Sequence, residues 1–278
     1  MTYDPNVTYP PPTQPVVTPP YFPDARVRWG LWDFAIGIAV FCGLLVVASV
    51  AISIPGIRAL LVPQAQLVNF LGAAAAYAGL FAVIVVASQR RGLRSLAGDF
   101  GLQFRPVDIA IGIGVGIGMR LFTVVLTLIT IGLTGYRPEH GNFILPVEPL
   151  WIALNGVLIG VIVAPIVEEL FFRGLLMRSV RHRVLRSKGR TQSVSPGIQR
   201  LAVRISVLVS AGAFMLLHLY QADNLTFAII LAGSTFTVGL VNALVATRTG
   251  RLGGGIIAHI FFNGSAVLLA IAASGSGA

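Results

Sequence analysis

The sequence predicts an all-α fold, a polytopic bundle of about seven transmembrane helices with the N-terminus inside and the C-terminus outside. Of its 278 residues, 55% are hydrophobic and only 11% are charged, and the mean hydropathy is +0.84. Several apolar runs also exceed the roughly 18 residues that indicate a membrane-spanning helix. A soluble domain does not need this much apolar material, so the composition excludes that class.

Seven apolar segments define the expected spans. They lie at residues 33–54, 66–88, 108–134, 150–173, 203–220, 225–247 and 253–273. Residues 1–28 are expected to form a disordered tail, because eight of the 16 prolines fall within the first 25 residues. Residues 29–149 then hold the N-terminal helices, and residues 150–273 hold the remaining helices.

The formal net charge is +10, and the basic residues concentrate in short loops between the spans. With the N-terminus inside, the inner segments hold Arg26 and Arg28, then Arg90, Arg91, Arg94 and Arg105, then the run from Arg178 to Arg204, then Arg248 and Arg251; only Arg58 and Arg137 fall outside. This bias follows the positive-inside rule, so it predicts topology and not nucleic-acid binding. The long run from 178 to 204 is interpreted as a topology anchor, with contact to anionic lipid headgroups as the alternative.

Three ionisable residues, Glu168, Glu169 and Arg173, lie in the fourth apolar segment. An ionisable residue at bilayer depth costs roughly 2.5 to 3.5 kcal/mol on insertion scales, so three together suggest a functional site. Glu169 and Arg173 are four residues apart on one helix face and can neutralise each other. Glu168 points about 100° away and lacks that partner, which makes it a candidate general base or acid. The alternative is that all three only tie helices together.

Two of the four histidines, His218 and His259, also lie in apolar segments. A single histidine there is more often a packing residue, but two of them with an unpaired glutamate favour a site. His259 and Asn263 are four residues apart and project from one face of the last span, where two neutral donors suit an oxyanion hole. His218 is expected to hold a water against Glu168, with Phe214 packed beside it.

Three motifs occur in order on successive spans: Glu-Glu-x-x-x-Arg at 168–173, Phe-x-x-x-His at 214–218 and His-x-x-x-Asn at 259–263. Together they resemble the motifs of the CPBP family, which contains the type II CAAX prenyl endopeptidases and the bacterial Abi intramembrane proteases. The resemblance covers roughly residues 150–270 and implies that residues 150–273 form a catalytic transmembrane core. It assigns these roles: Glu168 and His218 activate water, His259 and Asn263 stabilise the oxyanion, and Glu169 and Arg173 support the fold.

The expected function is that of an intramembrane endopeptidase, CAAX protease-like, which hydrolyses a peptide bond of a membrane-associated protein or peptide. A metal-free mechanism with a water activated by glutamate is preferred, so no cofactor is assigned. The alternative is a metalloprotease in which Glu168, His218 and His259 hold zinc, since a carboxylate and two imidazoles are a common ligand set. The chain has no His-Glu-x-x-His pair.

Two other functions would use the same residues differently. A non-catalytic membrane binding or immunity protein would hold a peptide in the same cavity, and a proton-coupled transporter would use the glutamates and histidines as a relay. Transporters commonly contain internal repeats, and this sequence shows none. The expected setting is the bacterial plasma membrane, with an N-terminus in the cytoplasm; the expected partners are the lipid bilayer and a membrane-associated substrate, without nucleic acid.

The depth of His218 is the main geometric difficulty. Simple vertical helices would leave it well removed from Glu168 and His259, so a shared site needs tilted or broken helices, and Pro165 offers one place for a kink. Arg120, in a glycine-rich stretch of the third span, is expected to pair with a glutamate or to reach an interface, and it is not assigned to the site. The single cysteine, Cys42, excludes an intrachain disulfide.

Overall fold

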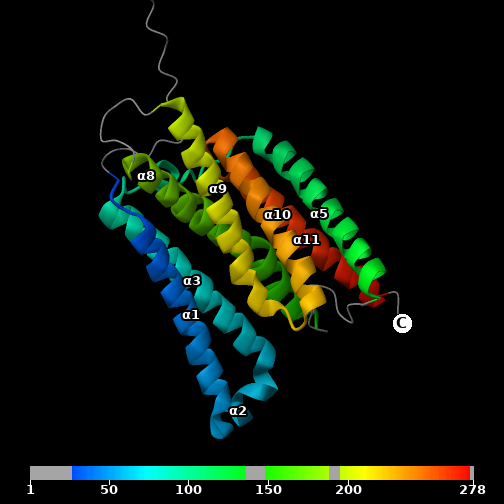
Figure 1. Cartoon of the computed structure of the whole chain (residues 1–278). Coiled ribbons are helices and arrows are strands. Elements are labelled where there is room, and N and C mark those ends of the chain that lie inside the picture. Colours follow the sequence, from blue (N-terminus) through cyan, green and yellow to red (C-terminus); the bar gives the residue numbers. More distant parts are fainter. Residues whose placement is uncertain (1–26, 136–147, 188–194, 276–278) are drawn as a thin grey trace, which may run out of the picture.

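A computed structural model describes residues 27–135, 148–187 and 195–275, and Figure 1 shows them as a bundle of long helices. Within these ranges the regular secondary structure is helical, with no strand. Seven of the described helices are long and apolar enough to cross a membrane. The predicted all-α bundle of seven spans is therefore confirmed.

The helices follow the order of the predicted spans. They are α1 (Leu31–Ser53), α2 (Pro55–Leu61), the 3-10 turn η1 (Val62–Gln64), α3 (Ala65–Arg91), α4 (Leu96–Phe100), α5 (Val107–Thr134), α6 (Pro149–Trp151), η2 (Ile152–Val163), α7 (Ala164–Glu168), η3 (Glu169–Leu176), α8 (Met177–Ser187), α9 (Pro196–His218), the 3-10 turn η4 (Leu219–Gln221), α10 (Leu225–Thr249) and α11 (Gly253–Gly275). Elements α6 through α8 follow one another without a gap, so the fourth span is part of one helical stretch of 39 residues.

The fourth and fifth helices are longer than the apolar segments that predicted them. The fourth continues past residue 173 to Ser187, and the fifth begins at Pro196 instead of residue 203. Hydropathy detects only the lipid-facing part of a helix, whereas arginine, which occurs four times in residues 174–187 and once in residues 196–202, is also a good helix former. The Ser195 side chain caps the start of α9, and Pro196 follows at a position where its missing N–H costs nothing.

The fourth span changes its winding on both sides of Pro165. Elements η2 and η3 are π-helices, in which each N–H bonds to the carbonyl five residues earlier, and the short α7 between them carries Pro165 near its start. The sequence suggests a kink at this proline, and the structure shows a change of helical winding around it. Glu168 ends α7 and Glu169 begins η3, so the two glutamates lie at the junction between the two windings.

Closely spaced glycines bring α5 against α11. A methyl group at Gly112 would lie 2.5 Å from the Ile257 side chain, and one at Gly116 would lie 2.8 Å from that of Phe261. These two positions therefore allow the close helix approach that small residues permit in membranes. A methyl group at Gly114 would meet nothing within 4 Å, so Gly114 lies on a different face of α5.

A buried ion pair fixes the ends of the same two helices. Arg251, in the turn between α10 and α11, lies 2.7 Å from Asp108 at the start of α5, and three guanidinium-to-carboxylate hydrogen bonds join them. These bonds hold the pKa of Arg251 above its usual value. The start of α11 is thereby tied to α5 before the two helices run side by side.

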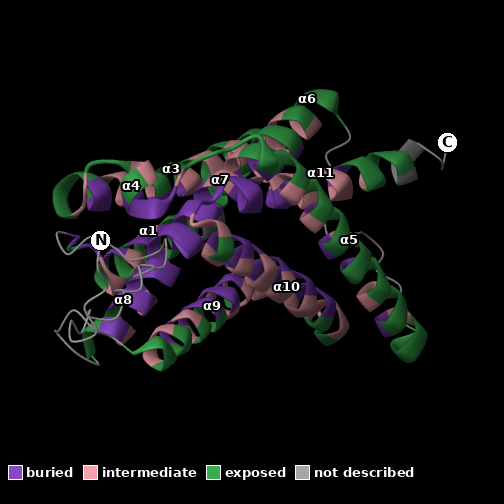
Figure 2. Ribbon diagram, turned by 90° about the horizontal axis from the view of Figure 1, so that it is seen from above, coloured by how far each residue is buried: buried purple, intermediate pink, exposed green. Residues whose placement is uncertain are grey.

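The outer faces of the helices are exposed and the faces toward the centre are buried (Figure 2). Large apolar side chains such as Leu133 and Leu225 are among the most exposed residues, as expected for a surface that faces lipid. Inside, Phe172 packs edge to face against both Phe171 and Phe214, with ring centroids 5.4 and 5.2 Å apart. This aromatic cluster joins the fourth span to α9.

The predicted tail falls outside the described residues as far as Arg26, as do Arg137 and His140. The last two residues of the predicted tail, Val27 and Arg28, belong to the helix bundle instead. Val27 is 1% exposed, and the Arg28 N–H donates to the Arg91 carbonyl at 2.7 Å. The packed part of the chain thus includes two residues that the sequence interpretation assigns to the tail.

Candidate functional site

A buried network centred on Glu169 joins the fourth span to α10 and α11. One oxygen of its carboxylate lies 3.2 Å from the Arg173 guanidinium, and both residues are fully buried. The Asn242 amide of α10 donates to the same oxygen at 3.0 Å, and Nδ1 of His259 lies 3.1 Å from it. The helical spacing that suggests mutual neutralisation of Glu169 and Arg173 thus corresponds to a direct ion pair. Their supporting role remains a prediction.

Arg173 also contacts the aromatic cluster. Its guanidinium carbon lies 4.5 Å from the ring centroid of Phe214, and its Nη2 donates to the Val238 carbonyl at 3.4 Å. A guanidinium over an aromatic face gains electrostatic attraction when it is desolvated. Arg173 therefore connects the Glu169 network to the helix that carries the second predicted motif.

Glu168 has different neighbours from Glu169. The Tyr77 hydroxyl of α3 donates to its Oε1 at 2.8 Å, and its Oε2 lies 3.8 Å from Nε2 of His259. Glu168 is 8% exposed, and among the described residues it forms no ion pair with an arginine. Its environment agrees with the separation of the two glutamates that helix geometry predicts, and Tyr77 adds a hydrogen bond that the sequence did not reveal.

The imidazole of His259 lies between the two glutamates. Its Nδ1 faces Glu169 and its Nε2 faces Glu168. An ionised carboxylate only accepts hydrogen bonds, so Nδ1 carries the hydrogen and donates it to Glu169. The Nε2 atom then donates only when the ring is protonated and accepts when it is neutral. A buried carboxylate that orients a histidine in this way resembles the arrangement that fixes the tautomer of a catalytic base.

Asn263 lies one turn after His259 and faces η2. Its amide nitrogen donates to the Gly160 carbonyl at 2.8 Å. A side-chain amide has two hydrogens on its nitrogen, so one donor remains after this bond is formed. The contact fixes the direction of the amide, and it leaves the predicted oxyanion role chemically feasible.

His218 reaches this group through Phe214. Its ring centroid lies 4.4 Å from that of Phe214, and Phe214 lies 5.6 Å from the ring of His259. Its Nδ1 lies 2.7 Å from the Phe214 carbonyl, which only accepts, so Nε2 is an acceptor in the neutral ring. Among the described residues no hydrogen bond or ion pair joins His218 to Glu168. The predicted packing of Phe214 against His218 is present, while the shared water stays a prediction.

The residues proposed as zinc ligands do not assemble into a metal site. Of the chain that the structure describes, no group of three His, Cys, Asp or Glu side chains is placed to hold a metal ion. Glu168 and His259 face each other, but His218 packs against Phe214 and turns its Nδ1 toward the backbone carbonyl of that residue. The donor set does not fit zinc in this arrangement, and no step is routed through a metal.

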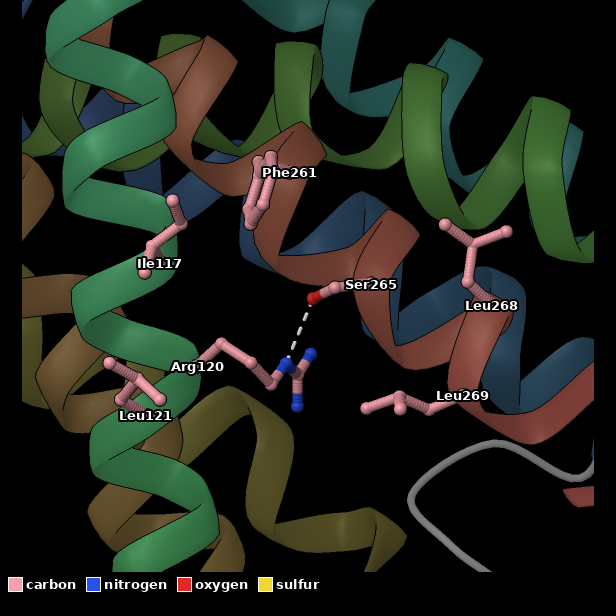
Figure 3. Close-up of a pocket in the computed structure, with 7 residues that line it drawn as sticks. All are labelled: Ile117, Arg120, Leu121, Phe261, Ser265, Leu268 and Leu269. Carbon is pink, nitrogen blue, oxygen red and sulfur yellow. Dashed lines mark hydrogen bonds between the residues drawn. The ribbon is translucent and has the colours of Figure 1, made fainter. Parts of the chain in front are cut away.

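Arg120 supports α11 from α5 and pairs with no carboxylate among the described residues. Its Nε donates to the Ser265 hydroxyl at 2.9 Å, its Nη2 donates to the Phe262 carbonyl, and its guanidinium lies 4.1 Å from the Phe262 ring centroid. Figure 3 shows the side chain crossing from α5 to α11 beside a groove of about 390 Å³. The groove is otherwise apolar, lined by Ile117, Leu121, Phe261, Leu268 and Leu269. Among the described residues these contacts replace the expected glutamate partner, while the expected reach of Arg120 to a membrane interface stays a prediction.

Sequence reasoning missed Tyr77, Asn242 and Gly160. Asn242 and Tyr77 carried a usable signal, because each is a polar side chain within an apolar span. That signal does not say which side of the helix faces the site. Gly160 contributes only a backbone carbonyl, for which the residue type gives no signal.

Comparison with known proteins supports the motif-based interpretation. Residues 149–265 match the family model described as type II CAAX prenyl endopeptidase Rce1-like. This range holds all three motifs and the seven predicted site and supporting residues, which are Glu168, Glu169, Arg173, Phe214, His218, His259 and Asn263. No curated protein and no solved structure shows a significant match to the chain. Residues 149–265 of the chain are thus similar to type II CAAX prenyl endopeptidase Rce1-like proteins.

Proposed function

We propose that this protein is an intramembrane endopeptidase that hydrolyses a peptide bond of a membrane-associated protein or peptide with a water activated by Glu168. The observation that carries the proposal is the single imidazole of His259 between two buried carboxylates, Glu168 and Glu169. One carboxylate has an arginine partner and the other does not, so the two are suited to different tasks. The family match over the same residues supports peptide hydrolysis as the reaction.

Glu168 serves as the base in this mechanism. It accepts one proton from water, the water oxygen bonds to the substrate carbonyl carbon, and a tetrahedral intermediate forms. The carbon–nitrogen bond then breaks, and Glu168 delivers the proton to the leaving amine. Tyr77 holds Oε1 of Glu168 at 2.8 Å, so Oε2, which faces His259, is the oxygen left for the water.

Asn263 and His259 stabilise the oxyanion. Asn263 offers the amide hydrogen that Gly160 does not use. His259 offers Nε2–H in its protonated form, because Nδ1 already donates to Glu169. In the neutral form the same Nε2 accepts a hydrogen bond and helps to orient the water. Donors fixed in place before the reaction are the usual source of such stabilisation.

His218 places the water or the substrate at the edge of the site. The bond from its Nδ1 to the Phe214 carbonyl sets Nε2 as an acceptor in the neutral ring. Phe214 packs against both histidines, so it holds the second motif against the third. In this proposal His218 acts through a water and not by direct contact with Glu168.

The proposed setting is the bacterial plasma membrane, with the N-terminus in the cytoplasm and the C-terminus outside. The distribution of arginines, which favours one side of the seven spans, supports this orientation. The substrate is then a protein or peptide that enters from the bilayer or its surface.

A census of protein termini in membranes tests the proposal. Cells would carry the wild-type chain, Glu168→Gln or Glu148→Gln at equal expression. Glu148 is exposed at the start of α6, so its substitution makes the same chemical change outside the site. New termini are expected with the wild type and Glu148→Gln but not with Glu168→Gln.

The rival functions predict other results. A binding or immunity protein leaves the termini unchanged in all three strains while its phenotype survives Glu168→Gln. A proton-coupled transporter also leaves the termini unchanged but loses a pH-dependent flux with Glu168→Gln. Identical termini in the wild-type and Glu168→Gln strains would therefore overturn the peptidase proposal.

A further inference from the structure

A second pocket lies between α8 and α9, away from the glutamate pair. It has a volume of about 360 Å³ and is lined by Arg181, Pro196, Gln199, Arg200, Val203 and Arg204. Three of these six residues are arginines and none is acidic. Its charge therefore calls for an anionic occupant.

The three arginines come from two helices. Arg200 and Arg204 are four residues apart on α9, so they project from one face, and both are exposed. Arg181 comes from α8 and is only 3% exposed, so packing fixes its side chain. A guanidinium presents several N–H donors in a planar fork that matches the oxygens of a phosphate. The two exposed guanidinium groups of α9, beside Arg181, therefore suit a phosphate.

The pocket lies near the ends of two helices that are long and apolar enough to cross a membrane. Arg181 is close to the last residue of the fourth spanning helix, Ser187, and Arg200 is close to the first residue of the fifth, Pro196. Phospholipid headgroups occupy this level of a bilayer, and basic pockets between transmembrane helices bind anionic headgroups. Pro196 and Val203 add apolar surface beside the arginines, which suits the glycerol and upper acyl atoms of a lipid.

We propose that this pocket binds the phosphate headgroup of an anionic phospholipid. The occupant would bridge α8, which continues the helix of the glutamate pair, and α9, which carries Phe214 and His218. Binding would thus stabilise the contact between the two helices that bring the first two motifs together. The proposal does not depend on peptide hydrolysis, because it concerns only charge and position.

Native mass spectrometry of the purified full-length chain in detergent tests this site. The protein would be titrated with phosphatidylglycerol, with phosphatidylcholine of the same acyl chains, and with glycerol 3-phosphate as a soluble phosphate. The wild type is expected to retain phosphatidylglycerol in preference to phosphatidylcholine. In Arg200→Gln/Arg204→Gln the apparent Kd for phosphatidylglycerol should rise roughly tenfold or more, since each arginine contributes to headgroup attraction.

Arg90→Gln/Arg94→Gln is the matched control, because it also removes two exposed arginines, one in the last turn of α3 and one just after that helix. It should bind phosphatidylglycerol as the wild type does. Both double variants alter exposed side chains, and circular dichroism would verify that they fold. If both double variants lost affinity for phosphatidylglycerol equally, the lipid would be attracted only by the total charge of the protein. That result would overturn the proposed site. Displacement of the lipid by an equal concentration of glycerol 3-phosphate would overturn the lipid as the source of the phosphate.

Discussion

His259 and Glu169 are joined through Nδ1 at 3.1 Å, in a place where the same glutamate also holds Arg173 at 3.2 Å. One carboxylate therefore both neutralises a buried cation and orients the imidazole that faces Glu168. Helical spacing predicts the Glu169–Arg173 pair and Glu168 as separate groups, but His259 contacts both glutamates and so connects them. Substitutions can uncouple the two tasks of Glu169.

Glu169→Gln is expected to destabilise the protein strongly. It leaves the fully buried Arg173 without its counter-ion, and removing one partner of a buried pair costs about 3–5 kcal/mol. Thermal unfolding in detergent, followed by circular dichroism, measures the loss. Arg173→Met added to Glu169→Gln should recover much of the stability, because no uncompensated charge remains.

The same double variant should cleave much more slowly, because the neutral amide at 169 accepts the Nδ1 hydrogen of His259 more weakly than a carboxylate and does not stabilise the protonated imidazole. Activity would be scored on termini that depend on the wild-type chain. A double variant that recovers both stability and cleavage would contradict the orienting role of Glu169 and leave it only the role of charge partner.

Tyr77→Phe is expected to slow cleavage without unfolding the protein. It removes the 2.8 Å hydrogen bond to Glu168 and keeps the ring. Hydrogen bonds to charged groups contribute about 1.5–3 kcal/mol, so the rate should fall by roughly tenfold to a hundredfold. Tyr220→Phe is the comparison, because Tyr220 is 64% exposed and interacts with Glu168 through charge, whereas Tyr77 donates a hydrogen bond to it. Equal effects of the two substitutions would refute a specific role for Tyr77.

The seven spans were predictable because each depends on local composition. Apolar length determines where a helix crosses lipid, and that information lies within each segment. The ends were less predictable where arginines extend a helix beyond its apolar part, as in α8 and at the start of α9. The change of helical winding around Pro165 could not be predicted either, because hydropathy carries no information on helical pitch.

In the candidate site, too, contacts within one helix were predictable from the sequence and contacts between helices were not. Spacing along one helix correctly places Glu169 beside Arg173, and it places Glu168 on another side. Contacts between helices, such as those of Tyr77 with Glu168 and of Asn242 with Glu169, depend on which faces meet. A single sequence carries no direct information on that choice, which explains why neither residue was identified.

Gly112→Ala and Gly116→Ala are expected to destabilise the packing of α5 against α11. Each added methyl would meet a side chain of α11 at less than 3 Å, and overpacking of this kind costs about 1–3 kcal/mol. Gly114→Ala is the control, because a methyl there meets nothing within 4 Å. It should be neutral or slightly stabilising, since alanine is the better helix former.

Because α11 carries His259 and Asn263, cleavage should fall together with stability in the first two glycine variants only. Thermal midpoints and cleavage rates would be measured on the same preparations. A loss with Gly114→Ala as large as with Gly112→Ala would show that the close approach of the helices is not the cause.

Arg120→Met tests whether the contacts of Arg120 on α5 position α11, and with it Asn263. The substitution removes the donors to Ser265 and to the Phe262 carbonyl, next to Asn263 in the chain. It also removes a cation that has no carboxylate partner among the described residues, and a lone charge at bilayer depth is costly. The two effects on stability oppose each other, so the thermal midpoint should change little while cleavage falls.

Ser265→Ala removes one acceptor, worth about 1 kcal/mol, and should reduce cleavage less. If Arg120→Met cleaved as fast as the wild type, the position of Asn263 would not depend on Arg120, and packing at Gly112 and Gly116 alone would set the register of α11.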